Sequence, residues 1–453
     1  MVEHPVWFPQ GSCMDAVFTT TDVKIPALAG FIKEVAADLA RGRTIADATR
    51  AAGYRHPAAL EAFDLGETTF ALNDTLTFPD EPLPERITFE RHNHRLSLKL
   101  NSLLADDVRS LLRLCAGGLT AEQIRREIDE PIYGLFETLL EKEIIVEALC
   151  PALRSASMLR PGITRLQHAA LYCRGREAGL LVDPHFHSSY EPKGLGRNFL
   201  RSQFEGVVDA ILISHSHEDH WHLPTLLTFP PDTIIVVPKV ARPTMLCPDF
   251  AATLRAFGFK RVVSLGWNDP PLLIGDLEVH ALPFYGEQPL LNEVPRHPDL
   301  RSHGNTYVIR HESYTSWILI DSGNDWAGRM ADVAHEVRAR FGIIDFLISN
   351  LRDFNISTPM YITGGHYWLS LTPDQLRRFA SMANDMITLG PRGVAEICHI
   401  VGARAFLPYA HWWGEIGENP GQEERFLMEQ LGGCLSEFGA PTRIVPWRIG
   451  DLA

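Results

Sequence analysis

Residues 211–222 read ILISHSHEDHWH, and this segment restricts the fold of the chain more than any other. Its apolar start predicts a buried strand, which ends abruptly in side chains that commonly bind metals. Because side chains alternate along an extended segment, His215 and His217 lie on the same side, and Asp219 and His220 follow in the loop. Imidazole nitrogens and a carboxylate at the mouth of a sheet suit a site for two metal ions. The alternative is a solvated loop that contains histidines by chance, which the apolar strand and the H-x-H-x-D-H spacing disfavour.

The composition is that of a globular protein with ample chain for a large core. The 453 residues are 45% hydrophobic and 22% charged, with a net charge of −14. This acidic balance disfavours nucleic acid or an anionic membrane as a partner, so we expect neither. The seven cysteines contain no C-x-x-C pair, which disfavours a disulfide framework and a zinc ribbon. With no recognisable signal peptide or membrane-spanning run, the sequence indicates a cytoplasmic protein with reduced thiols.

The sequence divides into two parts near Cys150–Pro151. Residues 1–150 are predicted to form a smaller, mainly helical accessory domain, and residues 151–453 a large metal-binding domain. Three short helical patterns and a β-branched run predict a winged-helix-like module at 91–148. Because no basic cluster accompanies it, we expect a dimerisation or peptide-docking role, which would make a homodimer, rather than DNA binding.

Apolar strands dominate the first half of the large domain, and strands alternate with helices in the second half. This pattern predicts an α+β fold with two packed sheets flanked by helices. The predicted strands span residues 163–173, 179–182, 208–214, 233–237, 261–264, 277–282, 305–310, 315–320, 346–349 and 404–408. The predicted helices span residues 28–41, 241–257, 326–340, 373–386 and 391–401, and Thr120 with Gln123 predicts a capping box in the smaller domain.

Four further segments carry a family resemblance: TRLQHA at 164–169, LVDP at 181–184, WILIDSG at 317–323 and GARAFLPYAHWW at 402–413. Together with the histidine motif, they resemble the metallo-β-lactamase superfamily over about residues 163–415. The resemblance implies an αββα sandwich with a dinuclear metal site at one edge of the sheets. It also implies Asp321 as the carboxylate that bridges the metals and Asp183 as a partner that orients a ligand imidazole.

The chain departs from the superfamily hydrolases between the histidine motif and Asp321. Those hydrolases place a histidine ligand in this interval, whereas here the segment LPFYGEQP offers Glu287. A carboxylate in place of an imidazole favours iron or manganese over zinc and suits O2 activation at iron. The segment resembles the diiron β-hydroxylase of chloramphenicol biosynthesis and related hydroxylases, in which a glutamate replaces that histidine. The alternative is that Glu287 is a surface acid and that His280 or His303 binds the metal.

The last metal ligand has two candidates. His366 lies in the Gly-rich segment YITGGHYW, and His411 lies at the end of a predicted strand in LPYAHWWGE. The hydrolase pattern favours His411, whereas the β-hydroxylase pattern favours His366, which we take as the predicted ligand with His411 as the alternative. His222 is not expected to bind metal, and His168 or His280 is expected just outside the ligands.

These residues predict a dinuclear iron monooxygenase. One iron would be held by His215, His217 and Glu287, and the other by Asp219, His220 and His366, with Asp321 bridging them. Asp219 and Glu287 are the predicted catalytic carboxylates. Such an enzyme needs two iron ions, O2, an external electron donor such as a reductase, and an amino-acid-derived substrate, either a small molecule or tethered to a carrier protein.

The alternative enzyme is a dinuclear zinc hydrolase. Two zinc ions would activate water towards an ester, lactone, amide or phosphodiester, with Asp219 orienting the nucleophile. A binding protein with a vestigial site is a weaker hypothesis, because no expected ligand position is plainly lost. A Ser–His–Asp hydrolase is disfavoured, because the sequence contains no G-x-S-x-G elbow.

Overall fold

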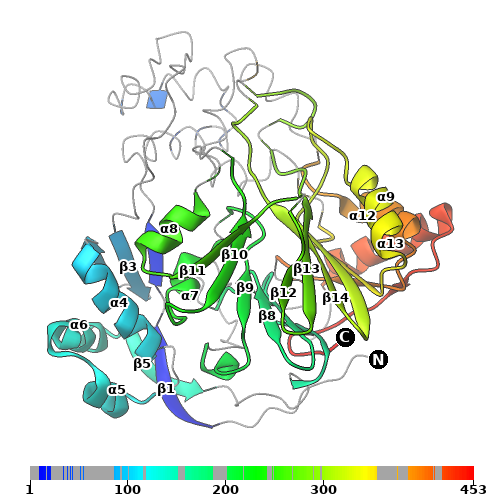
Figure 1. The fold of residues 1–453 in the computed structure, drawn as a ribbon. Helices are drawn as coiled ribbons and strands as arrows, with labels where there is room; N and C mark the ends of the chain where they lie inside the picture. The colour runs from blue at the N-terminus through cyan, green and yellow to red at the C-terminus, as the bar shows by residue number, and fades with distance from the viewer. Residues whose placement is uncertain are drawn as a thin grey trace.

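The structure, a computed structural model, has two facing β-sheets with helices on both outer sides and a smaller N-terminal part beside them (Figure 1). Within the part of the chain that is described, no helix is long and apolar enough to cross a membrane. The described residues are 10–16, 18–21, 34, 38, 41, 43, 51, 52, 55, 86–91, 94–99, 102–115, 119–150, 159–186, 201–217, 219–241, 247, 249–267, 269–288, 290–295, 298–352, 354, 375, 386–411, 413 and 421–453.

The first sheet has six strands in the order β11-β10-β9-β8-β7-β6. The strands from β8 to β11 pair in parallel, whereas β6, β7 and β8 pair antiparallel. β6, β8 and β9 are buried throughout, as expected for strands that are covered on both faces. The strands span Gly162–Arg165 (β6), Leu171–Arg174 (β7), Gly179–Val182 (β8), Ala210–Leu212 (β9), Ile234–Pro238 (β10) and Arg261–Leu265 (β11).

The second sheet has seven strands in the order β12-β13-β14-β15-β16-β17-β18. The strands from β12 to β15 pair antiparallel, and those from β15 to β18 pair in parallel. As a result, β13, β15 and β17 all run in the same direction. The strands span Leu272–Ile274 (β12), Leu277–Pro283 (β13), Asn305–His311 (β14), Tyr314–Ile320 (β15), Phe346–Ser349 (β16), Ala405–Pro408 (β17) and Arg443–Ile444 (β18).

Apolar side chains from the two sheets meet in a shared core. Leu180 and Leu212 of the first sheet and Ile309 and Ile318 of the second belong to one buried cluster. The other face of each sheet packs against helices, so the layer order is αββα and the predicted sandwich is confirmed. The covering helices are α7 (Leu223–Leu226) and α8 (Phe250–Ala256) on the first sheet, and α9 (Met330–Phe341), α12 (Gly390–Val401) and α13 (Gln422–Phe438) on the second.

A tight turn interrupts the run that was predicted as one strand over residues 163–173. Leu166 N donates to Ala170 O, and Ala170 N donates to Gln167 O, so the chain reverses between β6 and β7. His168 lies in this turn with a φ of 51°, an uncommon conformation for a residue with a side chain. The prediction of a single strand is therefore wrong, because the apolar pattern continues through a turn that lacks the usual turn residues.

The N-terminal part contains the three predicted short helices, and its predicted capping box between Thr120 and Gln123 is present. Apolar residues of all three helices share a core with α7, α8 and the first sheet. The winged-helix-like assignment and the boundary at residue 150 stay predictions. The elements are β1 (Gln10–Ala16), β2 (Phe18–Thr21), β3 (Arg86–Arg91), β4 (His94–Lys99), α4 (Ser102–Cys115), α5 (Ala121–Glu127), α6 (Glu130–Glu141) and β5 (Ile145–Cys150), with β1 paired to β5 and β2–β4 in a small sheet.

Other helix predictions differ in their bounds. The helix predicted at 241–257 is described only as α8, where the Asp249 side chain accepts a hydrogen bond from Ala252 N and caps the first turn. The helix predicted at 326–340 begins later, at Met330, because Met330 N donates to the Asn324 side chain. Nearly all of the predicted helix at 28–41 and of that at 373–386 lies outside the described residues.

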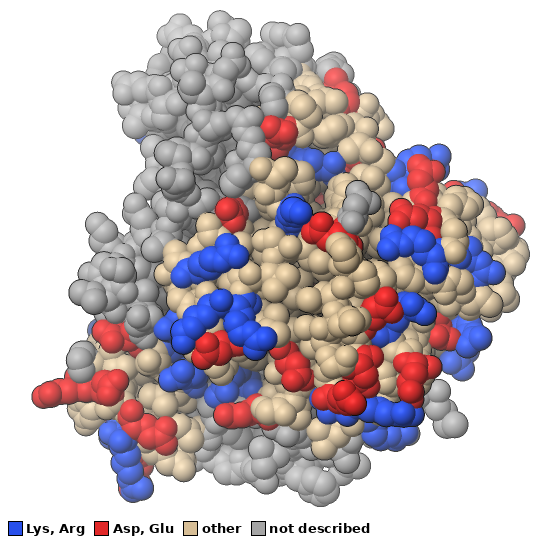
Figure 2. Space-filling model, in the orientation of Figure 1, with Lys and Arg blue, Asp and Glu red and all other residues tan. Residues whose placement is uncertain are grey.

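Charged side chains of both signs are interspersed on the face of the molecule in Figure 2. Several basic side chains have acidic partners, such as Lys239 with Asp269 and Lys260 with Asp232, each pair at 3.3 Å. Exposed pairs of this kind contribute only about 0–1 kcal/mol each to stability. They matter more for the electrostatic field at the surface. A surface on which both charge signs alternate lacks the continuous stripe of positive charge that is typical of nucleic-acid binding. That nucleic acid is not a partner stays a prediction.

Candidate metal centre

The candidate ligands lie where strands of both sheets end. His215 and His217 follow β9, Glu287 follows β13, Asp321 follows β15 and His411 follows β17. The three strands of the second sheet run in the same direction, so their carboxyl ends lie at one edge. Side chains on short loops after buried strands are held by a rigid scaffold while they remain accessible to a ligand.

The first group contains Glu287 and two histidines of the sequence motif. Glu287 Oε2 lies 3.1 Å from His215 Nε2 and 2.9 Å from His217 Nδ1. Glu287 and His215 are buried, and the His215 ring stacks on the buried Phe284 at 4.8 Å between centroids. One ligand atom from each of the three side chains lies within 4.8 Å of the others, so the group can hold a metal ion.

The second group is built on Asp321, which contacts two imidazoles through its two oxygens. Oδ2 lies 2.7 Å from His220 Nε2, and Oδ1 lies 2.9 Å from His411 Nε2. Ile320 turns the chain out of β15 with a φ of 61°, which is rare for a β-branched residue and marks a constrained loop. His215, His220 and Asp321 can also hold a metal ion, and because His215 belongs to both groups the two positions adjoin.

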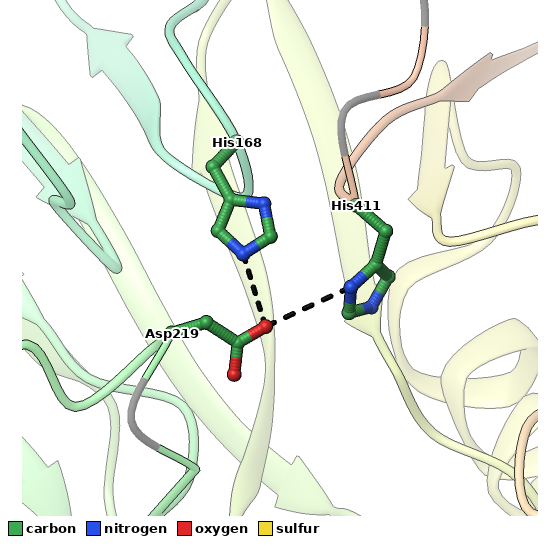
Figure 3. A group of neighbouring side chains, drawn as sticks. All are labelled: His168, Asp219 and His411. Atoms are coloured by element: carbon green, nitrogen blue, oxygen red, sulfur yellow. Dashed lines mark hydrogen bonds and ion pairs between the residues drawn. The ribbon is translucent and has the colours of Figure 1, made fainter. Parts of the chain in front are cut away.

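Asp219 lies between His168 and His411, as Figure 3 shows. Asp219 Oδ2 is 2.9 Å from His168 Nε2 and 3.7 Å from His411 Nδ1. His168 comes from the β6–β7 turn of the first sheet and His411 from the end of β17 in the second, so the site joins the two sheets. The three side chains form a further group that can hold a metal ion.

Asp183, at the end of β8, orients two of these histidines. Asp183 Oδ2 is hydrogen bonded to His220 Nδ1 at 2.9 Å and accepts from Ser214 Oγ at 2.5 Å, while Oδ1 accepts from Ser214 N at 2.7 Å. Ser214 Oγ also lies 2.8 Å from His215 Nδ1. The Nδ1 atoms are thereby engaged, and the Nε2 atoms of both rings face the carboxylates, as the resemblance implies for Asp183.

The donor set fits a pair of transition-metal ions. Among the described residues, five buried donor atoms face other groups of the site at ion-pair distances but make no regular hydrogen bond: His215 Nε2, His220 Nε2, Glu287 Oε2, Asp321 Oδ2 and His411 Nδ1. Leaving such groups unpaired costs free energy, and cations shared between them would satisfy all five atoms. Mixed imidazole and carboxylate donors are typical of iron, manganese and zinc sites.

Electrostatics keep the carboxylates of the site ionised. Burial by itself would raise the pKa of Asp219, Asp321 and Glu287, but the facing histidines outweigh it and hold the pKa of all three below its ordinary value. Burial lowers the pKa of His215, whereas the pKa of His220 is raised well above its usual value in spite of burial, because Asp219 and Asp321 face it. The carboxylates are therefore anionic at neutral pH, the form that binds a cation.

Some predicted site residues are not brought together. His366 lies outside the described residues, so its role stays a prediction. His280 lies outside the site, because its Nε2 is bonded to Glu278 Oε1 at 2.9 Å and its ring packs on Phe341 of α9. Of the two histidines expected just outside the ligands, His168 lies next to Asp219, whereas strand alternation turns His280 to the helix layer. His222 is the N-cap residue of α7, and its Nδ1 is hydrogen bonded to Thr225 Oγ1. Among the described residues, neither His222 nor His303 belongs to a group that could hold a metal ion.

Sequence reasoning missed several neighbours of the ligands. His185 is buried with its ring 5.2 Å from that of His168, and Arg352 Nε donates to His411 O at 3.2 Å. Arg301 and Asp325 form a buried pair next to the Glu287 loop. Asp325 alone carried a sequence signal, as a second acidic residue in the loop after β15.

The fold and the site define a class. The four-layer architecture, with a histidine motif at strand ends and clustered carboxylates, is the metallo-β-lactamase fold, and residues 162–287 match the beta-lactamase superfamily domain. The resemblance inferred from the sequence is confirmed for this part of the chain.

The chain is also similar to particular hydroxylases. It is 33% identical over 159 residues to the 4-amino-L-phenylalanyl-(CmlP-peptidyl-carrier-protein) 3-hydroxylase of Streptomyces venezuelae, a match that covers 35% of this chain and 28% of that protein. The crystal structure of CmlA, a diiron beta-hydroxylase from Streptomyces venezuelae, has a TM-score of 0.53 at 20% identity and covers 78% of this chain and 63% of that chain. A mutant of CmlA beta-hydroxylase gives 0.54 at 19% identity, covering 86% and 70%. The matches thus span 28% of the hydroxylase sequence and 63% and 70% of the two CmlA chains, and the structural likeness concerns the fold.

Proposed function

We propose that this protein is a dinuclear iron, O2-dependent monooxygenase that hydroxylates an amino-acid-derived substrate tethered to a carrier protein. The observation that carries the proposal is the contact of the buried Glu287 with both His215 and His217. The superfamily hydrolases that this chain resembles complete this group with a third imidazole. A carboxylate supplies a harder donor and a negative charge, which favours iron over zinc.

The proposed ligand set takes one group whole and combines members of the other two. His215, His217 and Glu287 would hold one metal, Asp219, His220 and His411 would hold the other, and Asp321 would contribute to the same site. We take His411 rather than His366, because the nitrogens of His411 lie 2.9 Å from Asp321 and 3.7 Å from Asp219. The metal pair would supply O2 activation, with electrons from an external donor such as a reductase.

The surrounding residues hold this set in place and keep it dry. Asp183 and Ser214 fix the orientation of two ligand imidazoles, and His168 holds Asp219 at 2.9 Å. The buried Phe284 ring covers one face of His215 and so excludes water from that side. A preorganised, water-poor site favours controlled redox chemistry over the release of reactive species.

The proposed substrate class comes from the hydroxylase similarity. The relative from Streptomyces venezuelae is named as acting on 4-amino-L-phenylalanyl carried by a peptidyl carrier protein. Because the match covers 28% of that protein, the proposal includes only an aminoacyl group on a carrier protein and leaves the amino acid open.

The test is the metal content and absorption spectrum of protein purified without added metal. We expect two irons per chain and near-ultraviolet charge-transfer absorption. Two zinc ions in a colourless protein that hydrolyses esters without O2 would instead support the dinuclear zinc hydrolase, for which the nitrogen-rich donor set is also suited.

A Glu287→Ala variant tests directly whether Glu287 binds metal, on which the proposal rests. We expect it to lose metal, because one group loses its only carboxylate. Glu278→Ala is the matched control, since Glu278 is an acid on β13 that pairs with His280 and Arg310 outside the site. A full metal load in Glu287→Ala would rule out Glu287 as a ligand and remove the support for iron.

A further inference from the structure

The loop that carries Glu287 is held by hydrogen bonds at four consecutive residues. Glu287 has a φ of 50°, which is uncommon for a residue with a side chain, and it follows Gly286, whose φ of 85° glycine adopts readily. The four backbone bonds are Arg301 Nη2 to Phe284 O at 3.5 Å, Gly323 N to Tyr285 O at 2.7 Å, Gly286 N to Asp325 Oδ2 at 3.1 Å and Glu287 N to Ile387 O at 3.0 Å.

Two of these four bonds come from one buried ion pair. Arg301 Nη2 lies 3.2 Å from Asp325 Oδ2, and the two side chains are 7% and 0% exposed. Asp325 Oδ1 also accepts from Ala327 N at 2.7 Å. Aromatic rings surround the guanidinium, which lies 5.8 Å from Trp267, 5.9 Å from Tyr285 and 5.5 Å from Trp326. Water is therefore largely excluded, and the loss of either partner would leave an uncompensated buried charge.

The same pair ties the Glu287 loop to the loop that carries Asp321. Asp325 follows Asp321 by four residues, and Gly323 between them donates to Tyr285 O. The two backbones approach so closely that a Cβ at Gly286 would lie 2.5 Å from Gly323 N. Hydrogen bonds therefore join the two loops into one unit, and each loop carries one carboxylate of the site, Glu287 or Asp321.

We propose that Arg301 and Asp325 are a positioning pair that fixes the Glu287 carboxylate relative to Asp321, and thereby the spacing of the two metal positions. The inference rests on the proposed function, because it takes both carboxylates as metal ligands. Neither Arg301 nor Asp325 touches the metal positions in this scheme. Their effect is transmitted through the Gly286 amide and the Phe284 carbonyl, in the manner of outer partners that orient ligands.

The experiment is a Co2+ titration of metal-free Asp325→Asn in the full chain, followed by visible absorption. An amide in place of the carboxylate turns a donor towards Arg301 or Gly286 N and leaves Arg301 without its counter-charge. We expect one of the two Co2+ ions to bind about 10–100-fold more weakly, with an altered absorption spectrum. A general loss of stability would not change the spectrum of the bound ion.

Asp345→Asn is the matched control. Asp345 accepts from Thr315 N at 2.8 Å and pairs with Arg404 at 2.6 Å at the opposite end of β15, so it is also an acid that anchors backbone and an arginine. We expect Asp345→Asn to bind two Co2+ ions with wild-type affinity and spectrum. A shifted spectrum in this control as well would overturn the assignment of a specific role to Asp325.

Two more variants keep the outcomes distinct. Arg301→Lys keeps the positive charge, but the lysine side chain lacks the planar group that reaches both Asp325 and Phe284 O. We expect it to weaken the binding of one Co2+ ion to a smaller extent, and it replaces Asp325→Asn if that variant does not fold. Glu287→Gln is the reference for loss of the ligand. If only Glu287→Gln weakens Co2+ binding, the positioning role fails while the proposed function stands; if Glu287→Gln also binds like wild type, the proposed metal role of Glu287 fails.

Discussion

Asp183 Oδ2 lies 2.9 Å from Nδ1 of His220, and the opposite nitrogen of that ring lies 2.7 Å from Asp321. The carboxylate therefore fixes the tautomer and the direction of the imidazole before any metal binds. We predict that Asp183→Asn lowers the metal affinity of the site about 10–100-fold. Competition with a chelator of known affinity measures the change.

The control for this prediction is Asp209→Asn. Asp209 Oδ2 accepts from Gly179 N at 2.9 Å at the other end of the same strand pair, so it anchors β8 without contact to the site. We expect this variant to keep wild-type affinity. If Asp183→Asn also keeps the wild-type metal affinity, the prediction is wrong, and Ser214 and the strand ends are sufficient to orient the histidines.

The choice between His411 and His366 can be made by metal counting. Ala410 and His411 have φ angles of 68° and 47°, and Arg352 holds the His411 carbonyl, so this imidazole is preset towards Asp321. We expect His411→Ala to lose about one metal per chain, whereas His366→Ala keeps two. Elemental analysis of both purified variants measures the metal content. Loss of metal in His366→Ala but not in His411→Ala would restore the ligand set with His366 that was predicted from the sequence.

Removal of the metals is expected to lower the thermal stability of the protein. The five buried ligand atoms without hydrogen bonds lose their partners, and the anionic carboxylates lose their counter-charge. A metal present at 100 times its dissociation constant stabilises a fold by about 3 kcal/mol, which corresponds to several degrees. Calorimetry of loaded and chelated protein measures the shift. The doubly substituted Glu287→Ala, His411→Ala protein should melt at one temperature with or without chelator.

Much of the site could be predicted because its parts follow apolar strands. His215, His217 and His220 are close in sequence, and Glu287 and Asp321 each come shortly after a strand whose pattern was clear. The proposal of His411 over His366 required the fold, because His411 lies 90 residues from Asp321, its hydrogen-bond partner. Both late histidines sit in segments rich in aromatic residues, and local pattern does not separate them.

Two other features could not be read from pattern. The turn at His168 interrupts an apolar run without glycine, proline or asparagine, so periodicity alone predicted a continuous strand and missed how closely this histidine approaches Asp219. Arg301 and Asp325 are 24 residues apart, and no local pattern in the sequence pairs them. Only the closed loops and the surrounding aromatic rings show that both are buried. The N-terminal helices could be predicted from local sequence patterns, whereas the winged-helix-like arrangement of these helices stays a prediction.

We expect His303 to make the stability of the protein depend on pH. Burial and the nearby charge of Arg301 lower the pKa of His303 from 6.5 to about 4. Between these pH values the unfolded chain binds a proton that the folded protein does not, so the free energy of unfolding falls as the pH drops from 6.5 towards 4, by on the order of 3 kcal/mol in total. We predict that His303→Asn flattens this dependence in urea unfolding at pH 7 and pH 4.5, whereas replacement of the exposed His335 on α9 by asparagine leaves it unchanged. Equal pH dependence in wild type and His303→Asn would show that the burial of this imidazole does not control acid stability.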